Sequence, residues 1–216
     1  MQKNIEVLQN RQQELLCFEN EYYKQGYERI AGVDEAGRGP LAGPLVVAAV
    51  VLNKGCALYG VDDSKKISEK KREQLYELII QQARDYSIRI ITPQQIDELN
   101  IYQATIQGMK ECLDELCPQV ALIDAMPIKS ERYISQSIIK GDSKSLSIAA
   151  ASILAKVTRD RIMRDLDLTY GEYGFAKHKG YPTKAHIEAV NKYGVTPCHR
   201  LSYEPIKSIV KTSVQG

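Results

Sequence analysis

The chain is poor in the side chains that build disulfides and zinc sites. Its five cysteines are an odd number and include no Cys-x-x-Cys pair, and its three histidines make a poor zinc set. These absences argue against a disulfide framework and a thiolate zinc site, and they suit a reducing compartment. The longest apolar run, residues 45–52, is far shorter than the roughly 20 residues that cross a membrane. The polar N-terminus lacks the apolar core of a signal peptide, so we expect a cytoplasmic protein with no membrane partner.

The chain also lacks an excess of charge of one sign. Its 29 Lys and Arg against 27 Asp and Glu leave a net charge of +2, so any contact with nucleic acid must come from local clusters. No Gly-x-Gly-x-x-Gly is present, and Arg38-Gly39 stands where a nucleoside-triphosphate loop needs Lys followed by Ser or Thr. The sequence therefore argues against binding of dinucleotides and nucleoside triphosphates.

Apolar periodicity predicts a layered α/β domain. Strand-like runs cover 28–34, 44–52, 86–92, 120–125 and 131–142, and helical patterns cover 4–25, 69–85, 101–116, 145–170 and 183–193. A Gly/Pro-rich turn between the first two strands predicts a hairpin, and Asn100 is the expected N-cap of the third helix. A mixed sheet flanked by helices is the natural packing for this order of elements.

Three of the strand-like runs end in acidic residues. Asp34 and Glu35 close the first run, Asp124 closes the fourth and Asp142 closes the fifth. If those strands are neighbours, their ends bring the carboxylates together, and such a cluster repels itself unless a cation is bound. Oxygen-only ligation is what Mg²⁺ or Mn²⁺ prefers. The alternative is that each acid is a solvated turn residue or a helix cap.

A pair of hard cations suits the cleavage of phosphodiester bonds. Two ions about 3.5–4 Å apart activate the attacking water and stabilise the leaving oxygen, so such a site needs no Ser, Cys or His nucleophile. The acids therefore favour hydrolysis by two Mg²⁺ or Mn²⁺ ions.

The loop after the first acids is a candidate for substrate recognition. Gly37 and Gly39 flank Arg38, and glycines let backbone groups approach a ligand without interference from a Cβ atom. Backbone groups that lie close to a sugar can test for a 2′-hydroxyl, which distinguishes RNA from DNA. The plain alternative is a tight turn that needs positive φ, with a solvated Arg38.

Two basic clusters could contact nucleic acid. Residues 62–72 include Lys65 and Lys66, which could bind phosphates. In residues 177–186, lysines alternate with Tyr181, an aromatic side chain that could stack on a sugar or a base. Most such charge runs are solvated surfaces, so either cluster by itself is a weak indication.

Several blocks of the sequence together resemble bacterial type 2 ribonuclease H, also called ribonuclease HII. The blocks occur in the order IAGVDEAGRGPLAGPLVVAAVVL, DDSKKIS, LIDA, IKGDSKSLSIAAASILAKVTRD and HKGYPTKAH. The resemblance implies a ribonuclease H-like α/β fold, with a five-stranded mixed sheet flanked by helices and a small helical C-terminal part. It divides the chain into an N-terminal helical lead-in (1–27), a catalytic domain (28–170) and a C-terminal substrate-contacting region (171–216).

The resemblance also implies an activity. The chain would be a divalent-metal endonuclease acting on RNA–DNA hybrids or on DNA duplexes that contain ribonucleotides. It would cut on the 5′ side of single embedded ribonucleotides and leave 3′-hydroxyl and 5′-phosphate ends. The sequence carries no sign of an oligomer, so we expect a monomer.

The family's functional residues can be carried over position by position. Its metal-binding acids match Asp34, Glu35, Asp124 and Asp142, and its loop that recognises the ribose 2′-hydroxyl matches Gly37, Arg38 and Gly39. Tyr181 matches the tyrosine that packs near the deoxyribose after the ribonucleotide. Lys65 and Lys66 fall in a block associated with phosphate contacts, and Asn100 is a further candidate of that kind.

Two other functions are compatible with the acids alone. A related integrase-like or resolvase-like nuclease would use the same carboxylates on other substrates, but it would not need the Gly-Arg-Gly loop and Tyr181. A non-catalytic nucleic-acid-binding module would tolerate loss of the acids and would carry a more basic surface than a net charge of +2 provides.

Overall fold

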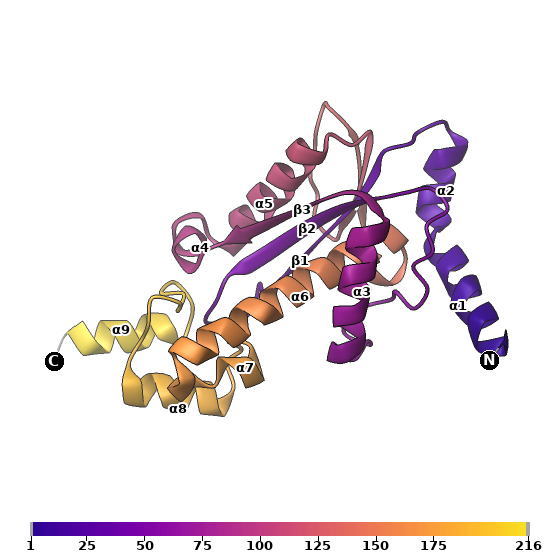
Figure 1. The fold of residues 1–216 in the computed structure, drawn as a ribbon. Helices are drawn as coiled ribbons and strands as arrows, with labels where there is room; N and C mark the ends of the chain where they lie inside the picture. Colours follow the sequence, from indigo (N-terminus) through magenta and orange to yellow (C-terminus); the bar gives the residue numbers. More distant parts are fainter. Residues whose placement is uncertain (1, 215–216) are drawn as a thin grey trace.

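The computed structural model describes residues 2–214 and is built around one mixed sheet (Figure 1). The strands are β1 (Ile30–Ala36), β2 (Leu45–Leu52), β3 (Ala83–Ile91), β4 (Val120–Asp124) and β5 (Ile134–Ile138), in the order β3-β2-β1-β4-β5. β2 pairs antiparallel with β1 and β3, whereas β4 pairs parallel with β1 and β5. The predicted five-stranded mixed sheet is thus confirmed, with β1 at its centre.

Helices cover both faces of the sheet (Figure 1). Every residue of β2 is buried, and successive side chains of a strand point to opposite faces, so both faces need apolar cover. On one face, Val46 and Val50 join a cluster with α3 (Glu69–Gln82) and α6 (Leu146–Thr169). On the other face, Val47 joins a cluster with α5 (Ile101–Leu116).

The long helix α6 lies directly against the central strand. A Cβ atom on Gly32 of β1 would overlap the backbone of Ser147, in the first turn of α6. Only glycine permits this approach, which fixes α6 along β1. Further along α6, the side chains of Ser152, Lys156 and Arg159 therefore reach the end of β1 that carries the acids.

The C-terminal part packs around the far end of α6. It contains a 3-10 turn (Gly171–Tyr173), α7 (Phe175–His178), α8 (Lys184–Tyr193) and α9 (Ile206–Val214), which lie together beyond the sheet (Figure 1). Phe175 is fully buried in a cluster with Met163 of α6. The helical C-terminal part follows the prediction, while the domain boundaries at residues 27 and 170 stay predictions.

Several predicted boundaries are wrong. The helix predicted over 4–25 is two helices, α1 (Gln2–Leu15) and α2 (Cys17–Lys24), because the chain turns at Leu16. The helix predicted over 69–85 ends at Gln82, where β3 begins to pair with β2. The first strand begins at Ile30 and runs on to Ala36, so Asp34 and Glu35, predicted to close it, lie just before its last residue.

The fifth strand is shorter than predicted. It ends at Ile138, and Lys140 then adopts a φ of 58°, which ends extended structure. Asp142 therefore lies in a separate 3-10 turn (Gly141–Ser143) and not at the end of a strand.

Three α-helices were not predicted, and one of them is the short α7 (Phe175–His178), which lies between the predicted helices 145–170 and 183–193. α4 (Pro93–Leu99) follows β3 directly, and it begins with a capping box in which Thr92 and Gln95 satisfy each other's backbone groups. α9 lies in the segment after residue 203, where the sequence shows little pattern. No helix within residues 2–214 is both long and apolar enough to cross a membrane.

Candidate active site

The acids of β1 and β4 meet at one edge of the sheet. β1 and β4 are parallel, and Val33 pairs with Ile123, so the next residues, Asp34 and Asp124, are neighbours on adjacent strands. Both carboxylates line a pocket of about 470 Å³, together with Glu35. Both faces of the strand end contribute to the pocket, because Asp34 and Glu35 are consecutive and both line it.

Asp34 and Glu35 are largely removed from water. Asp34 is 5% exposed, and its Oδ1 accepts a hydrogen bond of 2.7 Å from the backbone N–H of Glu35. The Oε2 atom of Glu35 is buried and has no hydrogen-bond partner. A buried carboxylate oxygen without a donor is costly, which marks this atom as one that a ligand would satisfy.

Burial and neighbouring carboxylates raise the pKa values of Asp34, Glu35 and Asp142. Burial, followed by the charges of Glu35 and Asp124, holds the pKa of Asp34 well above its ordinary value. Burial is also the main cause that raises the pKa of Glu35 to about 7, and Asp124 adds to it. The pKa of Asp142 is raised by burial and by the charges of Asp63 and Asp124. Negative charge is therefore concentrated here beyond what the protein compensates.

Asp142 is not one of the residues that line the pocket. The turn that carries it is tied to β4, because Oδ1 of Asp124 accepts a hydrogen bond of 2.6 Å from the N–H of Gly141. Its Oδ2 lies 3.8 Å from Nζ of Lys65, whose side chain does line the pocket. The structure thus brings Asp142 near the other acids through a turn.

These residues fit a hard divalent cation. The donors are carboxylate oxygens only, burial and the neighbouring carboxylates raise the pKa values of Asp34 and Glu35, and one buried oxygen of Glu35 is unpartnered. In the described part of the chain, however, no three Asp, Glu, His or Cys side chains already surround one point. The carboxylates are therefore arranged around a shared space and do not form a closed ligand cage.

The loop that follows β1 is held from behind by Arg200. This guanidinium, fully buried, donates hydrogen bonds of 2.6 Å to the carbonyl of Gly37 and 3.0 Å to that of Arg38. The C=O and N–H of a trans peptide point in opposite directions, so the amides of Arg38 and Gly39 face away from Arg200. Between residues 2 and 214, neither amide donates a hydrogen bond. Two backbone donors are thus unpaired beside the acids.

A second buried arginine fixes the rest of the loop. Arg159 of α6 donates to the carbonyls of Pro44 at 3.0 Å, Ala42 at 3.2 Å and Lys179 at 3.0 Å. Burial lowers its pKa to about 10. The sequence prediction missed Arg159 and Arg200. Arg159 follows a run of small apolar residues on its helix, which was an available indication, whereas nothing local marks Arg200.

Tyr181 meets the loop across the pocket. A Cβ atom on Gly180 would overlap the carbonyl of Ala42, so the tyrosine segment lies in backbone contact with the loop. Tyr181 is 46% exposed and lines the pocket, and its ring lies 3.6 Å from where a Cβ atom on Gly39 would stand. The predicted loop and tyrosine are therefore brought together.

The other residues predicted to contact substrate divide into those that line the pocket and those that do not. Lys65 lines the pocket, and Arg38 lines it too, with Nη1 3.6 Å from the Glu35 carboxylate. Lys66 is exposed and is not among the lining residues. Asn100 is the predicted N-cap, since its side chain accepts hydrogen bonds from the first turn of α5, but it does not line the pocket either.

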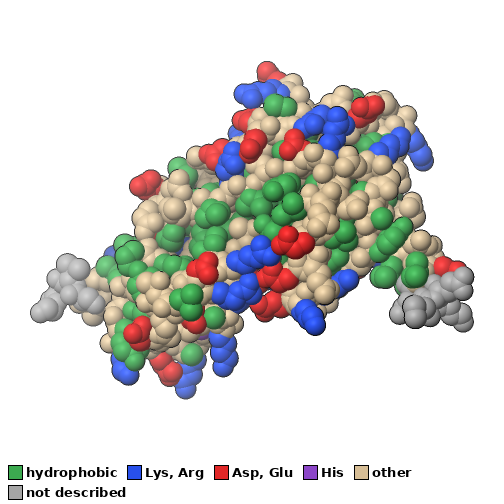
Figure 2. All heavy atoms as spheres, viewed as in Figure 1, with side chains coloured by type: hydrophobic (Ala, Val, Ile, Leu, Met, Phe, Trp, Pro, Cys, Tyr) green, Lys and Arg blue, Asp and Glu red, His purple; other side chains and the backbone are tan. Residues whose placement is uncertain are grey.

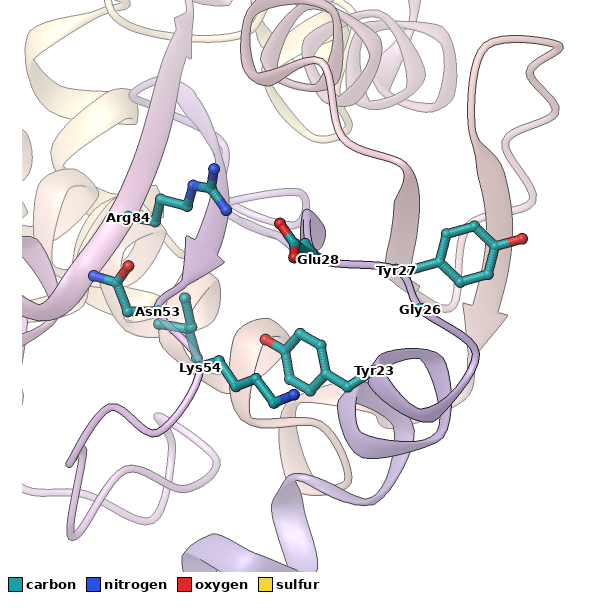
Figure 3. A pocket seen from close by; sticks show the side chains of 8 residues that line it. Tyr23, Gly26, Tyr27, Glu28, Asn53, Lys54 and Arg84 are labelled. Carbon is teal, nitrogen blue, oxygen red and sulfur yellow. The ribbon is translucent and has the colours of Figure 1, made fainter.

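A second pocket, of about 350 Å³, lies at the opposite end of β1. Figure 3 shows Glu28 and Arg84 pointing into this space from different segments. Nζ of Lys54 lies 5.4 Å from the centre of the Tyr23 ring at its lower edge. Glu28 is the one carboxylate in its lining, so this pocket offers no group of acids comparable to the first.

The chain resembles known proteins along most of its length. A family model for ribonuclease HII matches residues 31–206. Ribonuclease HII of Clostridioides difficile (strain 630) is 52% identical over 202 residues, which are 93% of this chain and 79% of that protein. The crystal structure of ribonuclease H2 from Pyrococcus horikoshii OT3 has a TM-score of 0.75 at 30% identity and covers 87% of this chain and 100% of that one.

A more distant structure shares the fold alone. Bst-RNase HIII, solved in complex with Mn²⁺, has a TM-score of 0.64 at 19% identity and covers 90% of this chain and 73% of its own. The matched family segment contains the acids, the glycine loop and Tyr181. The chain therefore belongs to the ribonuclease HII family, whose members are endonucleases that hydrolyse RNA in RNA–DNA hybrids.

Proposed function

We propose that this chain is a divalent-metal-dependent endonuclease that cuts duplex DNA on the 5′ side of single embedded ribonucleotides. The products carry 3′-hydroxyl and 5′-phosphate ends. The proposal is supported above all by the position of the two unpaired amides, of Arg38 and Gly39, in the same pocket as Asp34 and Glu35. Chemistry at a phosphate and recognition of the adjacent sugar then occupy neighbouring positions.

The proposed ligands of the metal are Asp34, Glu35, Asp124 and Asp142. Bound there, Mg²⁺ or Mn²⁺, as two ions in the substrate complex, would lower the pKa of a coordinated water and stabilise the leaving oxygen. The pKa values of Asp34 and Glu35, which burial and the neighbouring carboxylates raise, would fall once a cation is bound beside them. Asp34 is the shared ligand in this scheme, because both Glu35 and Asp124 act on it electrostatically.

The glycine loop is the proposed reader of the sugar. Its amides are donors, and a ribose 2′-hydroxyl accepts a hydrogen bond that a deoxyribose cannot accept. Because Arg200 holds the carbonyls of Gly37 and Arg38, the donors are oriented before substrate binds. Such preorganisation limits the entropy lost on binding.

Tyr181 is proposed to test the next nucleotide. Its exposed ring provides an apolar surface opposite Gly39, on which a deoxyribose can pack. A ribose at that position would bring an extra hydroxyl against the ring. The enzyme in this proposal is a cytoplasmic monomer, with residues 171–216 as its substrate-contacting region.

The test is cleavage of three end-labelled duplexes in Mg²⁺, in Mn²⁺ and in chelator. One duplex is DNA with a single ribonucleotide, one is all DNA, and one is an RNA–DNA hybrid. We expect one metal-dependent cut on the 5′ side of the ribonucleotide and no cut in all-DNA duplex. Cleavage of all-DNA duplex would keep the metal site but refute recognition of the sugar.

Two acid variants test the assignment of the metal ligands. Asp124→Asn and Asp142→Asn keep the shape of the side chain but remove a charge that the metal needs, so near-complete loss of cleavage is expected from folded protein. Normal rates in both variants would show that the metal assignment is wrong. If the folded wild-type protein cut no duplex, a non-catalytic binding role would replace this proposal.

A further inference from the structure

The N-terminal helix α1 precedes the segment that the ribonuclease HII family model matches, yet it is docked on the body of the protein. Leu15 of α1 is fully buried in the core cluster beside β2. The side chain of Gln12 is buried as well, where it donates to the carbonyl of Cys56 and accepts from the N–H of Leu58, both at 2.8 Å. One face of α1 is therefore held in place against the segment that follows β2.

Arg11, next to this anchor, contacts two segments that are distant in sequence. Its guanidinium binds the carboxylate of Asp62 through two hydrogen bonds, of 3.1 and 3.0 Å, and donates a third, of 2.9 Å, to the carbonyl of Ser143. Ser143 is adjacent to Asp142, the proposed metal ligand of the 3-10 turn. Arg11 thus contacts the backbone of the turn that carries this ligand.

The other partner of Arg11 leads to the same acid. Oδ1 of Asp62 accepts from the N–H of Asp63 at 2.8 Å, and Oδ1 of Asp63 accepts from the N–H of Lys65 at 2.9 Å. Nζ of Lys65 in turn lies 3.8 Å from Oδ2 of Asp142. These contacts link Arg11 to Asp142 by two routes, one through residues 62–65 and one through Ser143.

The energy of these contacts indicates what they do. The side chains of Arg11 and Asp62 are 33% and 28% exposed, and a partly exposed ion pair contributes little to stability. A bidentate guanidinium pair is, however, geometrically specific, because both hydrogen bonds constrain the carboxylate's plane. The contacts of Arg11 are therefore better suited to fixing the position of the Asp142 turn than to stabilising the fold.

We propose that Arg11 is a positioning residue of the nuclease site, which holds the Asp142 turn and the Lys65 loop in the spacing that metal binding needs. The inference rests on the proposed role of Asp142 as a metal ligand. It assigns to the N-terminal helix a part in the active site, in addition to its packing.

The test is an Mn²⁺ titration of full-length protein without nucleic acid, followed by loss of the free-ion paramagnetic resonance signal. Arg11→Met keeps a long side chain and removes the hydrogen bonds, and we expect its dissociation constant for Mn²⁺ to rise about tenfold, as for other residues that support metal ligands. The metal concentration that half-saturates cleavage should rise in the same proportion, while KM for the duplex changes less. Asp62→Asn should reproduce the effect, and the double variant should be no worse than either single one.

Two controls separate positioning from folding. Glu14→Gln removes the exposed partner of Arg11, 3.1 Å away, and should behave as wild type. Glu19→Gln weakens a buried cap at the start of α6, where Glu19 accepts from the N–H and hydroxyl of Ser147, so it should lower stability without changing Mn²⁺ affinity.

The outcomes are distinguishable. Unchanged Mn²⁺ affinity in Arg11→Met, with wild type normal, overturns the positioning role alone, even if the variant melts earlier. Failure of wild-type protein to bind Mn²⁺, or wild-type affinity in Asp142→Asn, overturns the proposed function and this inference with it.

Discussion

Glu35 is a carboxylate that the protein buries without completing its hydrogen bonds. Its side chain is 13% exposed, its Oε2 has no donor, and burial together with Asp124 raises its pKa to about 7, even though Arg38 acts in the opposite direction. A proton therefore binds Glu35 more tightly in the folded chain than in the unfolded chain, where its pKa is near 4.5. The stability associated with this proton is complete below pH 4.5 and is lost as the pH rises through 7.

With chelator present, we expect the contribution of Glu35 to the free energy of unfolding of the wild-type protein to fall as the pH rises from 4.5 to 7. Glu35→Gln cannot ionise, so the difference in stability between variant and wild type should shift in the variant's favour across that range. Urea unfolding at a series of pH values measures it. If the free energies of unfolding of the two proteins changed with pH in parallel, the pKa of Glu35 would not be raised in the folded chain.

Gly37 and Gly39 differ in why they are glycine. Gly37 has a φ of +101°, and an added Cβ atom would overlap the side chain of Arg159. Gly39 has no such strain, since the nearest atom to an added Cβ is the Tyr181 ring at 3.6 Å. The first glycine is required by the backbone and the packing, whereas the second leaves space where we propose the sugar binds.

Alanine at these two positions should therefore have different effects. Gly37→Ala should lose about 1–3 kcal/mol of stability, because it forces positive φ and a steric overlap. Gly39→Ala should change stability by less than about 0.5 kcal/mol, yet reduce kcat/KM on the duplex with one ribonucleotide. Urea unfolding and initial rates measure the two effects, with Arg38→Ala as the side-chain control. Full activity in Gly39→Ala would count against reading by the loop backbone.

Among the elements, the loop after β1 depends on residues from α6 and from the segment after α8. Arg159 and Arg200 are buried, and within residues 2–214 they bind backbone carbonyls and the Tyr203 hydroxyl but no carboxylate. Each guanidinium replaces water at several carbonyls simultaneously. The position of the loop beside the acids is thus set by the C-terminal part as much as by β1.

Arg200→Met should leave the carbonyls of Gly37, Arg38 and Gly43 without their donor. An unsatisfied buried polar group costs about 1–3 kcal/mol, so a total loss on the order of 3 kcal/mol is expected in urea unfolding. Arg132→Met is the control, because Arg132 is 77% exposed and its ion pair with Asp114 should contribute about 1 kcal/mol or less. Equal effects of the two substitutions would contradict the account of the loop.

At the scale of the whole molecule, opposite charges nearly balance, with 29 Lys and Arg against 27 Asp and Glu. Figure 2 shows acidic and basic side chains interleaved where α3 and α6 cross. Arg161 and Arg164 of α6 bind Glu69, Glu73 and Glu77 of α3 there. These pairs neutralise one another, so we expect attraction for a duplex to come from basic side chains outside them.

Lys177, an exposed residue before Tyr181, should be one of these contacts. Lys177→Gln should weaken binding of every duplex type to a similar degree and reduce the slope of log affinity against log salt by about 1. Lys110→Gln, on α5, is the control and should leave the slope unchanged. Fluorescence anisotropy at several salt concentrations, with Ca²⁺ in place of Mg²⁺, measures the slope. An unchanged slope in Lys177→Gln would exclude this contact.

Local features of the sequence determined most of the fold. Strands and helices follow from apolar periodicity, and caps such as Asn100 lie within one turn of the helix that they begin. The acids of β1 and the glycines after them were also recognisable, because the family resemblance spans them. The errors were local in origin too: the positive φ of Lys140 ends β5 early, and the capping box at Thr92 starts a helix that was not predicted.

Only the tertiary structure decided how the site is supported. Arg200 meets Gly37 across 163 positions, and Arg11 meets Ser143 across 132, so no short window of sequence contains either pair. Packing of α6 on β1 and docking of α1 bring these residues together. Sequence periodicity reports which residues share a face of one element, whereas contacts between elements depend on how the faces pack. The candidate catalytic residues could therefore be predicted from the sequence, whereas the contacts between elements that hold them in position could not.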